Sequence, residues 1–269
     1  MGIKFFTLSA VLVQILVAET FKPPTIIIET GIQGKHMDYE EVDELGDILD
    51  TEKSKIDELK GYFISLKYKV ADGTIMGNSN YLEIKASTLN GNTDYTGAYI
   101  GSGLGYGSLK SKTSNDIDEV EVNFYETEYA QDHIGFIFAG LGYRKWDRQL
   151  SGTQLEKYRW LNFNIGMGGE TEIVPNYMRI GLDAAIKMSL WKEMKIETPT
   201  FNETFKLGTV TTMVVGVPLV THLNEYFDFI IRVEYEYMKI EKSNVIEGYY
   251  EPESESHNFN AMASIRAQF

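Results

Sequence analysis

The feature that most constrains this chain is a strict alternation of apolar and polar residues. Between Tyr177 and Leu190 nearly every second residue is large and apolar, whereas Arg179, Asp183 and Lys187 lie at positions between them. Successive side chains of a β-strand point to opposite faces, so a period of two predicts a strand with one apolar and one charged face. The same alternation marks three further stretches, Phe227 to Tyr237, Tyr62 to Val70 and Leu82 to Ala86.

Ten stretches with strand character divide the chain. They are longer than the roughly 5 to 6 residues of soluble strands and suit the roughly 9 to 11 residues that cross a bilayer at a tilt. Tyr, Phe and Trp recur near their ends, where amphipathic rings suit lipid headgroups. We expect an all-β fold, an antiparallel transmembrane β-barrel of about ten strands with acidic outer loops. Eight or twelve strands, or a soluble β-sandwich or lipocalin-like barrel, are the alternatives. The predicted strands are 25–34, 61–70, 80–89, 120–130, 134–145, 158–169, 177–190, 209–220, 226–240 and 257–269.

Short and long connections join these stretches. In outer-membrane barrels the short connections face the periplasm and the long ones face outward, and an even strand number leaves both termini in the periplasm. Within the first long connection, Val42, Leu45, Leu49, Ile56 and Leu59 have roughly helical spacing, which predicts a short amphipathic helix. The predicted periplasmic turns are 71–79, 131–133, 170–176 and 221–225, and the predicted outer loops are 35–60, 90–119, 146–157, 191–208 and 241–256.

The composition agrees with an exported, strand-rich chain. Residues 1–18 combine Lys4, an apolar stretch and Ala18, which predicts a signal peptide followed by a barrel domain over 19–269. A buried or anchoring N-terminal helix is the alternative. After residue 18 no run of about 20 apolar residues occurs, so helical membrane spans are not expected. The chain has no cysteine, which excludes disulfides and thiolate sites, and its net charge of −14 disfavours nucleic acid as a partner.

The end of the chain carries a second signal. The last stretch continues its alternation to the final residue, with Phe259, Ile265 and Phe269 on the apolar side. This ending resembles the C-terminal signal by which the barrel assembly machinery recognises its substrates. The segment from Phe136 to Arg144 resembles a strand of the small proteobacterial outer-membrane β-barrel proteins. The resemblance covers the layout of roughly residues 60–269. It implies a barrel in the outer membrane of a Gram-negative bacterium, in families that include pores, adhesins, structural proteins and a few enzymes.

The charged residues of the alternating stretches predict the lining of the lumen. Both signs are present, so opposed charges are expected to pair across a narrow barrel. A packed polar interior is one interpretation, and a narrow water-filled channel lined by these groups is the other. The predicted inward residues are Glu29, Lys67, Lys69, Glu83, Lys85, Glu126, Glu128, Arg144, Arg179, Asp183, Lys187, Asp228, Arg232, Glu234, Glu236 and Arg266.

The sequence holds no recognisable catalytic or metal-binding motif. His36 and His257 are the histidines expected near the outer rim, and neither stands in a motif with a nucleophile and an orienting group. We therefore expect no enzyme activity, no cofactor and no bound metal. The expected function is a structural or narrow-pore role, with adhesion or ligand binding through the outer loops as the alternative.

The expected partners follow from this location. They are outer-membrane lipid, lipopolysaccharide and the barrel assembly machinery, with no nucleic acid, and the chain is expected to be a monomer. The many carboxylates between Lys35 and Lys60 predict a solvated surface. Alternatively, these carboxylates share divalent cations with the anionic lipopolysaccharide, because Ca²⁺ and Mg²⁺ prefer oxygen ligands.

Overall fold

The computed structural model describes residues 23–73, 78–98, 105–130 and 132–269. Within these ranges the regular secondary structure consists of β-strands, and the paired strands run antiparallel. None of the described segments is a helix long and apolar enough to cross a bilayer. The predicted signal peptide, residues 1–18, lies outside the described residues.

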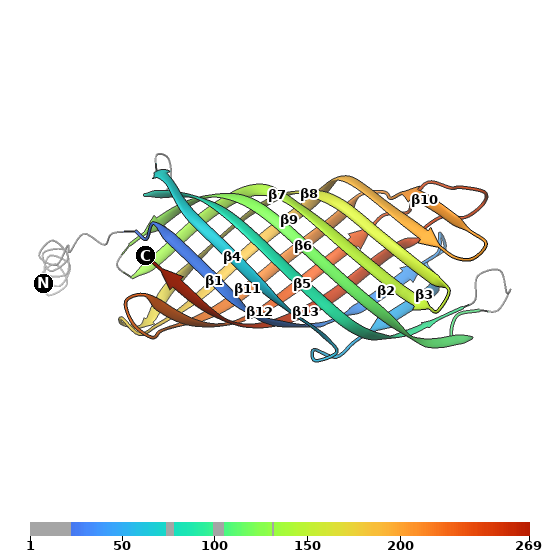
Figure 1. The fold of residues 1–269 in the computed structure, drawn as a ribbon, viewed down its shortest axis with the longest axis horizontal. Helices are drawn as coiled ribbons and strands as arrows, with labels where there is room; N and C mark the ends of the chain where they lie inside the picture. Colours follow the sequence, from blue (N-terminus) through green and yellow to red (C-terminus); the bar gives the residue numbers. More distant parts are fainter. Residues whose placement is uncertain (1–22, 74–77, 99–104, 131) are drawn as a thin grey trace, which may run out of the picture.

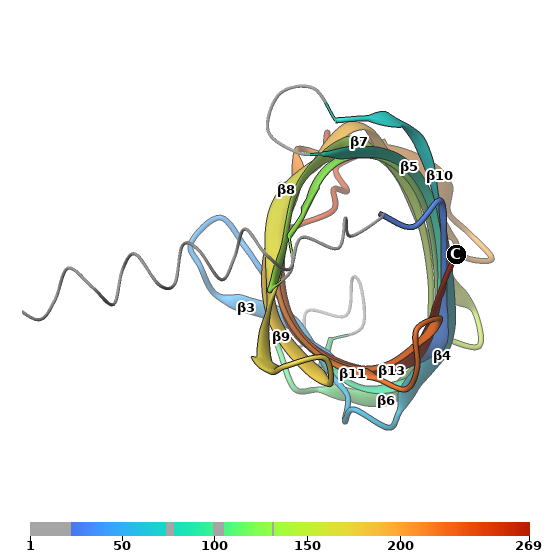
Figure 2. The same ribbon diagram turned by 90° about the vertical axis from the view of Figure 1, so that its left-hand side faces the viewer.

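Ten long strands form one closed barrel (Figures 1 and 2). β1 pairs with β4 on one side and with β13 on the other, so the sheet closes without a free edge along the barrel. Closure satisfies the backbone hydrogen bonds of each strand, as a bilayer requires. The predicted ten-stranded antiparallel barrel is therefore confirmed. Its strands are β1 (Ile26–His36), β4 (Leu59–Asp72), β5 (Ser79–Gly97), β6 (Leu109–Tyr129), β7 (His133–Ser151), β8 (Gln154–Val174), β9 (Met178–Glu197), β11 (Val210–His222), β12 (Phe227–Ile240) and β13 (Glu253–Gln268).

The two ends of the barrel differ in their connections. β1 begins and β13 ends at the same end, where Ile27 pairs with Gln268 (Figure 1). The strands that flank the short predicted turns meet at this end, and we call it the periplasmic end, by the convention for outer-membrane barrels. At the outer end, four of the predicted loops, 35–60, 90–119, 146–157 and 191–208, are largely strand in the described residues. β5 and β6 extend far into 90–119, and β7 and β8 continue to a tight turn within 146–157.

The helix predicted within 35–60 is wrong. The segment forms a hairpin of β2 (Asp38–Val42) and β3 (Ile48–Lys53), which turns at Gly46 with a φ of 85°. β2 pairs with β13 and β3 pairs with β5, so the hairpin continues the wall where β1 and β4 end. The open edges of β5 and β13 need backbone partners, and that requirement outweighs the helical spacing of a few apolar side chains. A third short strand, β10 (Asn202–Lys206), pairs with β9 at the same end (Figure 1).

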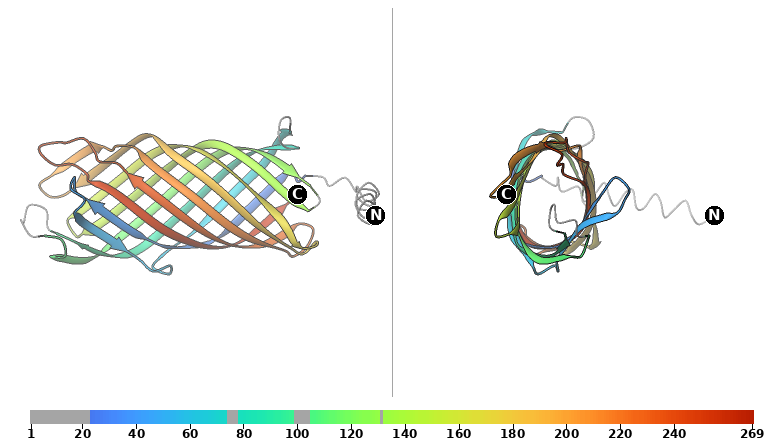
Figure 3. Two further views of the ribbon diagram at one scale, coloured as in Figure 1. Left: turned by 180° about the vertical axis from the view of Figure 1, so that it is seen from behind. Right: turned by 90° about the vertical axis from the view of Figure 1, so that its right-hand side faces the viewer.

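The outward faces of the strands carry a continuous apolar band. Ile165 on β8 and Leu182 on β9 are 53% and 61% exposed, and the outward residues around them are also apolar. Hydrocarbon is the solvent that suits so large an exposed apolar surface. Closer to the outer end the outward residues are polar, for example Lys145 on β7 and Lys157 on β8. The wall of the barrel, oval when viewed along its axis (Figure 3), therefore continues beyond the membrane.

Replacing Ile165 by arginine tests the position of this band. A charge in the middle of the outward apolar row of β8 is expected to lower the free energy of unfolding by about 2–4 kcal/mol in a bilayer. The measurement is denaturant unfolding of the protein refolded into phosphatidylcholine vesicles. Ser114→Arg, on the outward face of β6 beyond the band, is the matched control and is expected to change this free energy by less than about 0.5 kcal/mol. Equal losses in the two variants would contradict the placement.

Candidate functional site

The inward faces of the strands enclose a polar cavity of about 260 Å³. Its lining runs from Tyr129 and Gln268, near the periplasmic end, to Ile117 and Arg144, deeper in the barrel. The cavity is therefore the membrane-level lumen of the barrel. Of the residues predicted to face inward, those that line it are Glu29, Lys67, Glu83, Lys85, Arg144, Asp183, Lys187, Arg232, Glu234, Glu236 and Arg266.

Three other predicted residues also turn inward, close to the periplasmic end. Asp228 is fully buried, and its Oδ1 lies 2.6 Å from Nδ1 of His222. Arg179 lies 3.9 Å from Glu170. Lys69 pairs with Asp72 at 2.9 Å. These residues border the mouth of the lumen rather than its middle.

Glu126 and Glu128 were predicted to face inward, and this assignment is wrong. Both share the outward parity of Val122 and Phe124, while Tyr125 and Thr127 take the inward positions between them. Alternation in β6 is unbroken from Leu109 to Tyr129, so the whole strand keeps one parity.

Glu119 and Glu121 are the carboxylates of β6 that line the lumen, and the sequence analysis missed them. Val120, Val122 and Phe124 form an apolar row that faces outward. Alternation then predicts that Glu119 and Glu121, at the positions beside and between them, face inward. Glu119 accepts hydrogen bonds from Arg144 and Lys187, each at 2.8 Å.

Ion pairs cross the outer part of the lumen. Arg144 on β7 contacts Glu119 on the neighbouring strand at 2.8 Å and Glu236 on the distant strand β12 at 3.1 Å. Glu236 also pairs with Lys35 of β1 at 2.8 Å. Lys187 of β9 reaches Glu121 at 2.6 Å. These contacts tie together strands that are not neighbours in the sheet and fill the space between them.

A second group of ion pairs lies on the wall formed by β9, β11 and β12. Arg232 contacts Asp183 through two parallel hydrogen bonds of 2.5 and 2.6 Å and Glu234 at 3.0 Å. Gly216 of β11 lies between these strands, and a Cβ atom there would be 2.1 Å from Nη2 of Arg232. Glycine therefore leaves the space through which the guanidinium reaches across β11. The bidentate geometry is the stronger form of an arginine–carboxylate pair.

Toward the periplasm, Arg266 provides a third centre. It contacts Glu29 at 3.2 Å and Glu170 at 3.3 Å. Lys67 lies over the ring of Tyr125, with Nζ 3.7 Å from the ring centroid, and 3.9 Å from Glu83. Charges of both signs thus compensate one another along the lumen, as opposed inward charges in a narrow barrel should.

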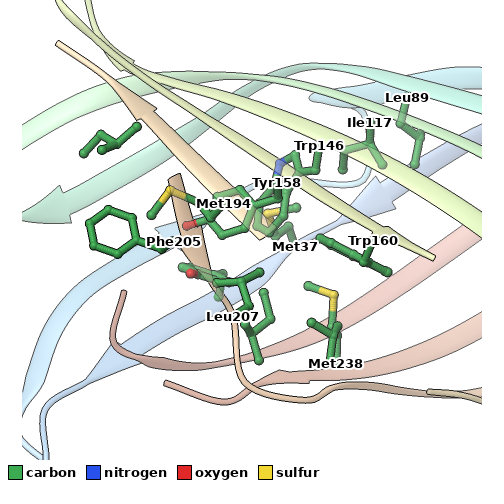
Figure 4. Close-up of a cluster of buried hydrophobic side chains, with 14 of the residues drawn as sticks. Met37, Leu89, Ile117, Trp146, Tyr158, Trp160, Met194, Phe205, Leu207 and Met238 are labelled. Carbon is green, nitrogen blue, oxygen red and sulfur yellow. The ribbon is translucent and has the colours of Figure 1, made fainter. Parts of the chain in front are cut away.

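A layer of buried apolar side chains lies inside the barrel, at the outer end of the cavity (Figure 4). Trp146 is 1% exposed. Its ring stacks on that of Tyr158, with 5.1 Å between the ring centroids, and meets the ring of Tyr39 edge-on, with 5.6 Å between the centroids. Such ring geometries add to the free energy of burial. We call this layer the plug, and it consists of Met37, Tyr39, Ile117, Trp146, Tyr158, Trp160 and Met238.

The plug reflects a reversal of polarity along the strands. Within the apolar band of β7, Leu141 and Tyr143 face outward. Beyond it the inward residues include Trp146 and Leu150, while the outward ones include Lys145. The outer part of the barrel therefore has an apolar core and a polar exterior, as a water-soluble β-barrel does. The sequence analysis missed the plug, although this reversal is visible in the sequence.

The histidines lie apart from one another. His257 hydrogen-bonds to the hydroxyl of Tyr235 at 2.7 Å, and His36 contacts the carbonyl oxygen of Ser54. Within the described residues no group of three or more His, Asp or Glu side chains is arranged to hold a metal ion.

The residues of the expected assembly signal lie along the seam between β13 and its neighbours. Phe259 and Ile265 are exposed on the outward face. The carbonyl oxygen of Phe269 accepts hydrogen bonds from the backbone N–H groups of Thr25 and Ile26, which extends the closure of the barrel to the last residue. Recognition by the assembly machinery stays a prediction.

Comparison with known proteins identifies the fold. No protein-family model matches the chain, and no curated protein matches it. Among solved structures, the outer-membrane protease OmpT of Escherichia coli superposes with a TM-score of 0.60 at 12% identity, covering 93% of this chain and 99% of OmpT. OprG of Pseudomonas aeruginosa is also similar, with a TM-score of 0.42 at 12% identity over 92% of this chain and 97% of OprG. The chain thus has the fold of an outer-membrane β-barrel.

Replacing Glu236 by alanine tests the ion pairs across the lumen. The change leaves the buried Lys35 without its carboxylate, so we expect a loss of about 3–5 kcal/mol in the free energy of unfolding. Glu253→Ala removes an exposed partner of Lys239 and is expected to cost less than about 1 kcal/mol. Denaturant unfolding in detergent micelles provides both values. A Glu236→Ala variant as stable as the control would refute the structural role of these pairs.

Proposed function

We propose that this protein is a structural outer-membrane β-barrel whose lumen does not conduct ions, and that it supports a rigid β-walled extension at the cell surface. The plug is the observation that supports this proposal. Its aromatic and methionine side chains are buried across the lumen, immediately beyond the cavity. A hydrated ion would have to displace several packed rings to pass. Apolar constrictions exclude ions in channels by the same means.

The lumen charges favour the structural role over a narrow pore. Arg144, Lys187, Arg232 and Arg266 each contact at least one carboxylate, so the side chains that would bind a permeating ion already bind one another. Selectivity in a channel depends on charges that remain available to the ion. We infer that these pairs hold the strands together.

We also propose that the protein is not a protease, although the fold matches that of OmpT. At 12% identity the likeness extends to the fold alone. A histidine base needs an orienting partner and a nucleophile or water. His36 and His257, at the outer side, contact a carbonyl oxygen and a tyrosine hydroxyl rather than a carboxylate.

The signal peptide, export and residence in a Gram-negative outer membrane complete the proposal, with lipid, lipopolysaccharide and the assembly machinery as partners. The apolar band supports residence in a membrane, and the amino-acid sequence of residues 1–18 supports export.

Conductance in planar bilayers tests the closed lumen. We expect no stepwise current from the wild-type protein at either polarity, because the plug closes the lumen. The combined variant Trp146→Ala, Tyr158→Ala and Trp160→Ala removes most of the ring volume and is expected to produce current steps, which also demonstrates insertion. Reproducible current steps from the wild-type protein would contradict the proposal.

The hairpin of β2 and β3 favours a second candidate function, binding at the cell surface. The hairpin projects beside the oval outline of the barrel (Figures 2 and 3), and Leu45 at its tip is 88% exposed. An exposed apolar residue with Asp43, Glu44 and Asp47 as neighbours in the sequence offers a contact point for an adhesion partner.

Exchange of Asp43–Asp47 for a two-residue Asn-Gly turn tests this second candidate. The turn preserves the antiparallel register of a hairpin, so the barrel is expected to fold as before. If the hairpin mediates adhesion, bacteria displaying the variant should lose attachment to host-cell monolayers relative to bacteria displaying the wild-type protein. Equal attachment by the two strains would exclude the hairpin tip.

A further inference from the structure

A buried arginine lies directly beyond the plug and joins four strands. Arg148 of β7 is 0% exposed. Its Nη2 and Nε lie 2.8 and 3.1 Å from Glu52 of β3, and its Nη1 lies 3.2 Å from Glu41 of β2 and 3.1 Å from Glu156 of β8. The guanidinium thus attaches both strands of the β2–β3 hairpin to β7 and β8 on the opposite wall. We call the buried space around Arg148, between the hairpin and these two strands, the outer chamber.

Two further carboxylates belong to the same chamber. Glu251, which precedes β13 and is 6% exposed, accepts a hydrogen bond from the hydroxyl of Tyr158. Asp50 of β3 pairs in register with Glu41 of β2. Among the described residues no lysine or arginine other than Arg148 forms an ion pair with any of these five carboxylates. One guanidinium therefore faces Glu41, Asp50, Glu52, Glu156 and Glu251.

The other polar groups packed around the five carboxylates are uncharged. Asn115 of β6 donates to Glu52 at 2.6 Å, and Thr93 of β5 also donates to it. Tyr39 of β2 donates to Glu41 at 2.8 Å. Ser254 of β13 pairs in register with Glu41 and is 1% exposed. None of these groups supplies positive charge.

The remaining neighbours of the five carboxylates are also uncharged, so they do not change the net charge of the chamber. Tyr95 of β5 lies beside Asp50, Gln154 of β8 donates to Glu156 at 2.9 Å, and Trp146 donates to Asn115 at 2.7 Å. Five ionised carboxylates around one cation in a buried chamber would carry a net charge of about −4, which is strongly unfavourable. Some of them must hold protons in the closed state.

We propose that the outer chamber is a proton-operated latch, in which protonated carboxylates hold the β2–β3 hairpin against β7 and β8 and their ionisation loosens it. Repulsion acts chiefly between Glu41 and Asp50 on the hairpin and Glu156 on β8, and Glu251, which lies beside β2 and reaches Tyr158 of β8, adds to it. The backbone ladders to β5 and β13 persist, and Arg148 then remains, among the described residues, as the one cation that links the hairpin to β7 and β8. The strands in the membrane are unaffected, because their charges are compensated.

The pKa values agree with this arrangement. Burial, with the negative charge of Glu41, raises the pKa of Asp50 to about 7. Burial also raises the pKa of Glu156 and, together with Glu41 and Glu156, that of Glu251. In the unfolded chain these groups ionise near pH 4. The folded chamber therefore binds more protons than the unfolded chain above about pH 4, and its stability falls as the pH rises through about 7.

Hydrogen exchange of the full chain in detergent micelles tests the latch. We expect the backbone amides of 38–53 to exchange at least about tenfold faster at about pH 8.5 than at about pH 5.5, after correction for intrinsic exchange. The magnitude follows because a pKa shift of one unit changes the opening equilibrium about tenfold. In the Glu156→Gln, Glu251→Gln variant, which keeps the shape without the charge, this increase should fall below about threefold. Glu253→Gln, on an exposed neighbouring residue, should behave as the wild type. Amides of β8 within the apolar band are the internal control.

Several results would overturn the proposal. One is a corrected exchange rate of 38–53 that does not change with pH in the wild-type protein. Another is a glutamine variant with the full wild-type increase. A third concerns Ca²⁺ added to the wild-type protein at high pH. If Ca²⁺ alone lowers the corrected exchange rate of 38–53 to its low-pH value, a bound ion rather than protons neutralises the carboxylates. If the double variant does not fold, Asp50→Asn replaces it, with the same reduction expected.

Discussion

The hydrogen bonds of the backbone set the architecture of this protein. Within hydrocarbon no water is present to satisfy an exposed N–H or C=O group, so a sheet that crosses the membrane must close on itself. β1 meets this need by pairing with both β4 and β13, and Phe269 extends the seam to the last residue. Once the sheet is closed, each strand has one face toward lipid and one toward the lumen. The alternation of the sequence and the ion pairs inside follow from that division.

Beyond the membrane the same strands continue in water. There the apolar side chains belong inside the barrel and the polar ones outside, the reverse of the arrangement in lipid. Apolar residues turn inward and form the plug, while lysines and carboxylates face outward. A single strand such as β7 therefore changes the polarity of its two faces along its length. This arrangement combines a membrane barrel with a water-soluble barrel in one sheet. It also accounts for the buried apolar side chains of the plug, since the soluble part needs a core.

The sequence predicted the membrane part well because alternation there is strong and uniform. The ten strands and the inward positions of Arg144, Arg232 and Glu236 were all accessible from it. Glu126 and Glu128 were misassigned because they lie at the end of β6, where the outward row is no longer apolar. The β2–β3 hairpin was missed because its pairing depends on the edges of β5 and β13, which are distant in sequence. The contacts of Arg148 depend on the same long-range pairing.

The central claim is that hydrocarbon solvates every second residue of the band, and a nitroxide scan of β9 tests it most directly. Since the chain has no cysteine, single cysteines at successive positions from Met178 to Leu190 can each carry one label in protein refolded into vesicles. The account predicts that accessibility to oxygen, which concentrates in lipid, rises and falls with a period of two, with maxima at the outward positions such as Leu182 and Met188. High accessibility of those positions to a water-soluble nickel chelate, without a period-two oxygen signal, would contradict it.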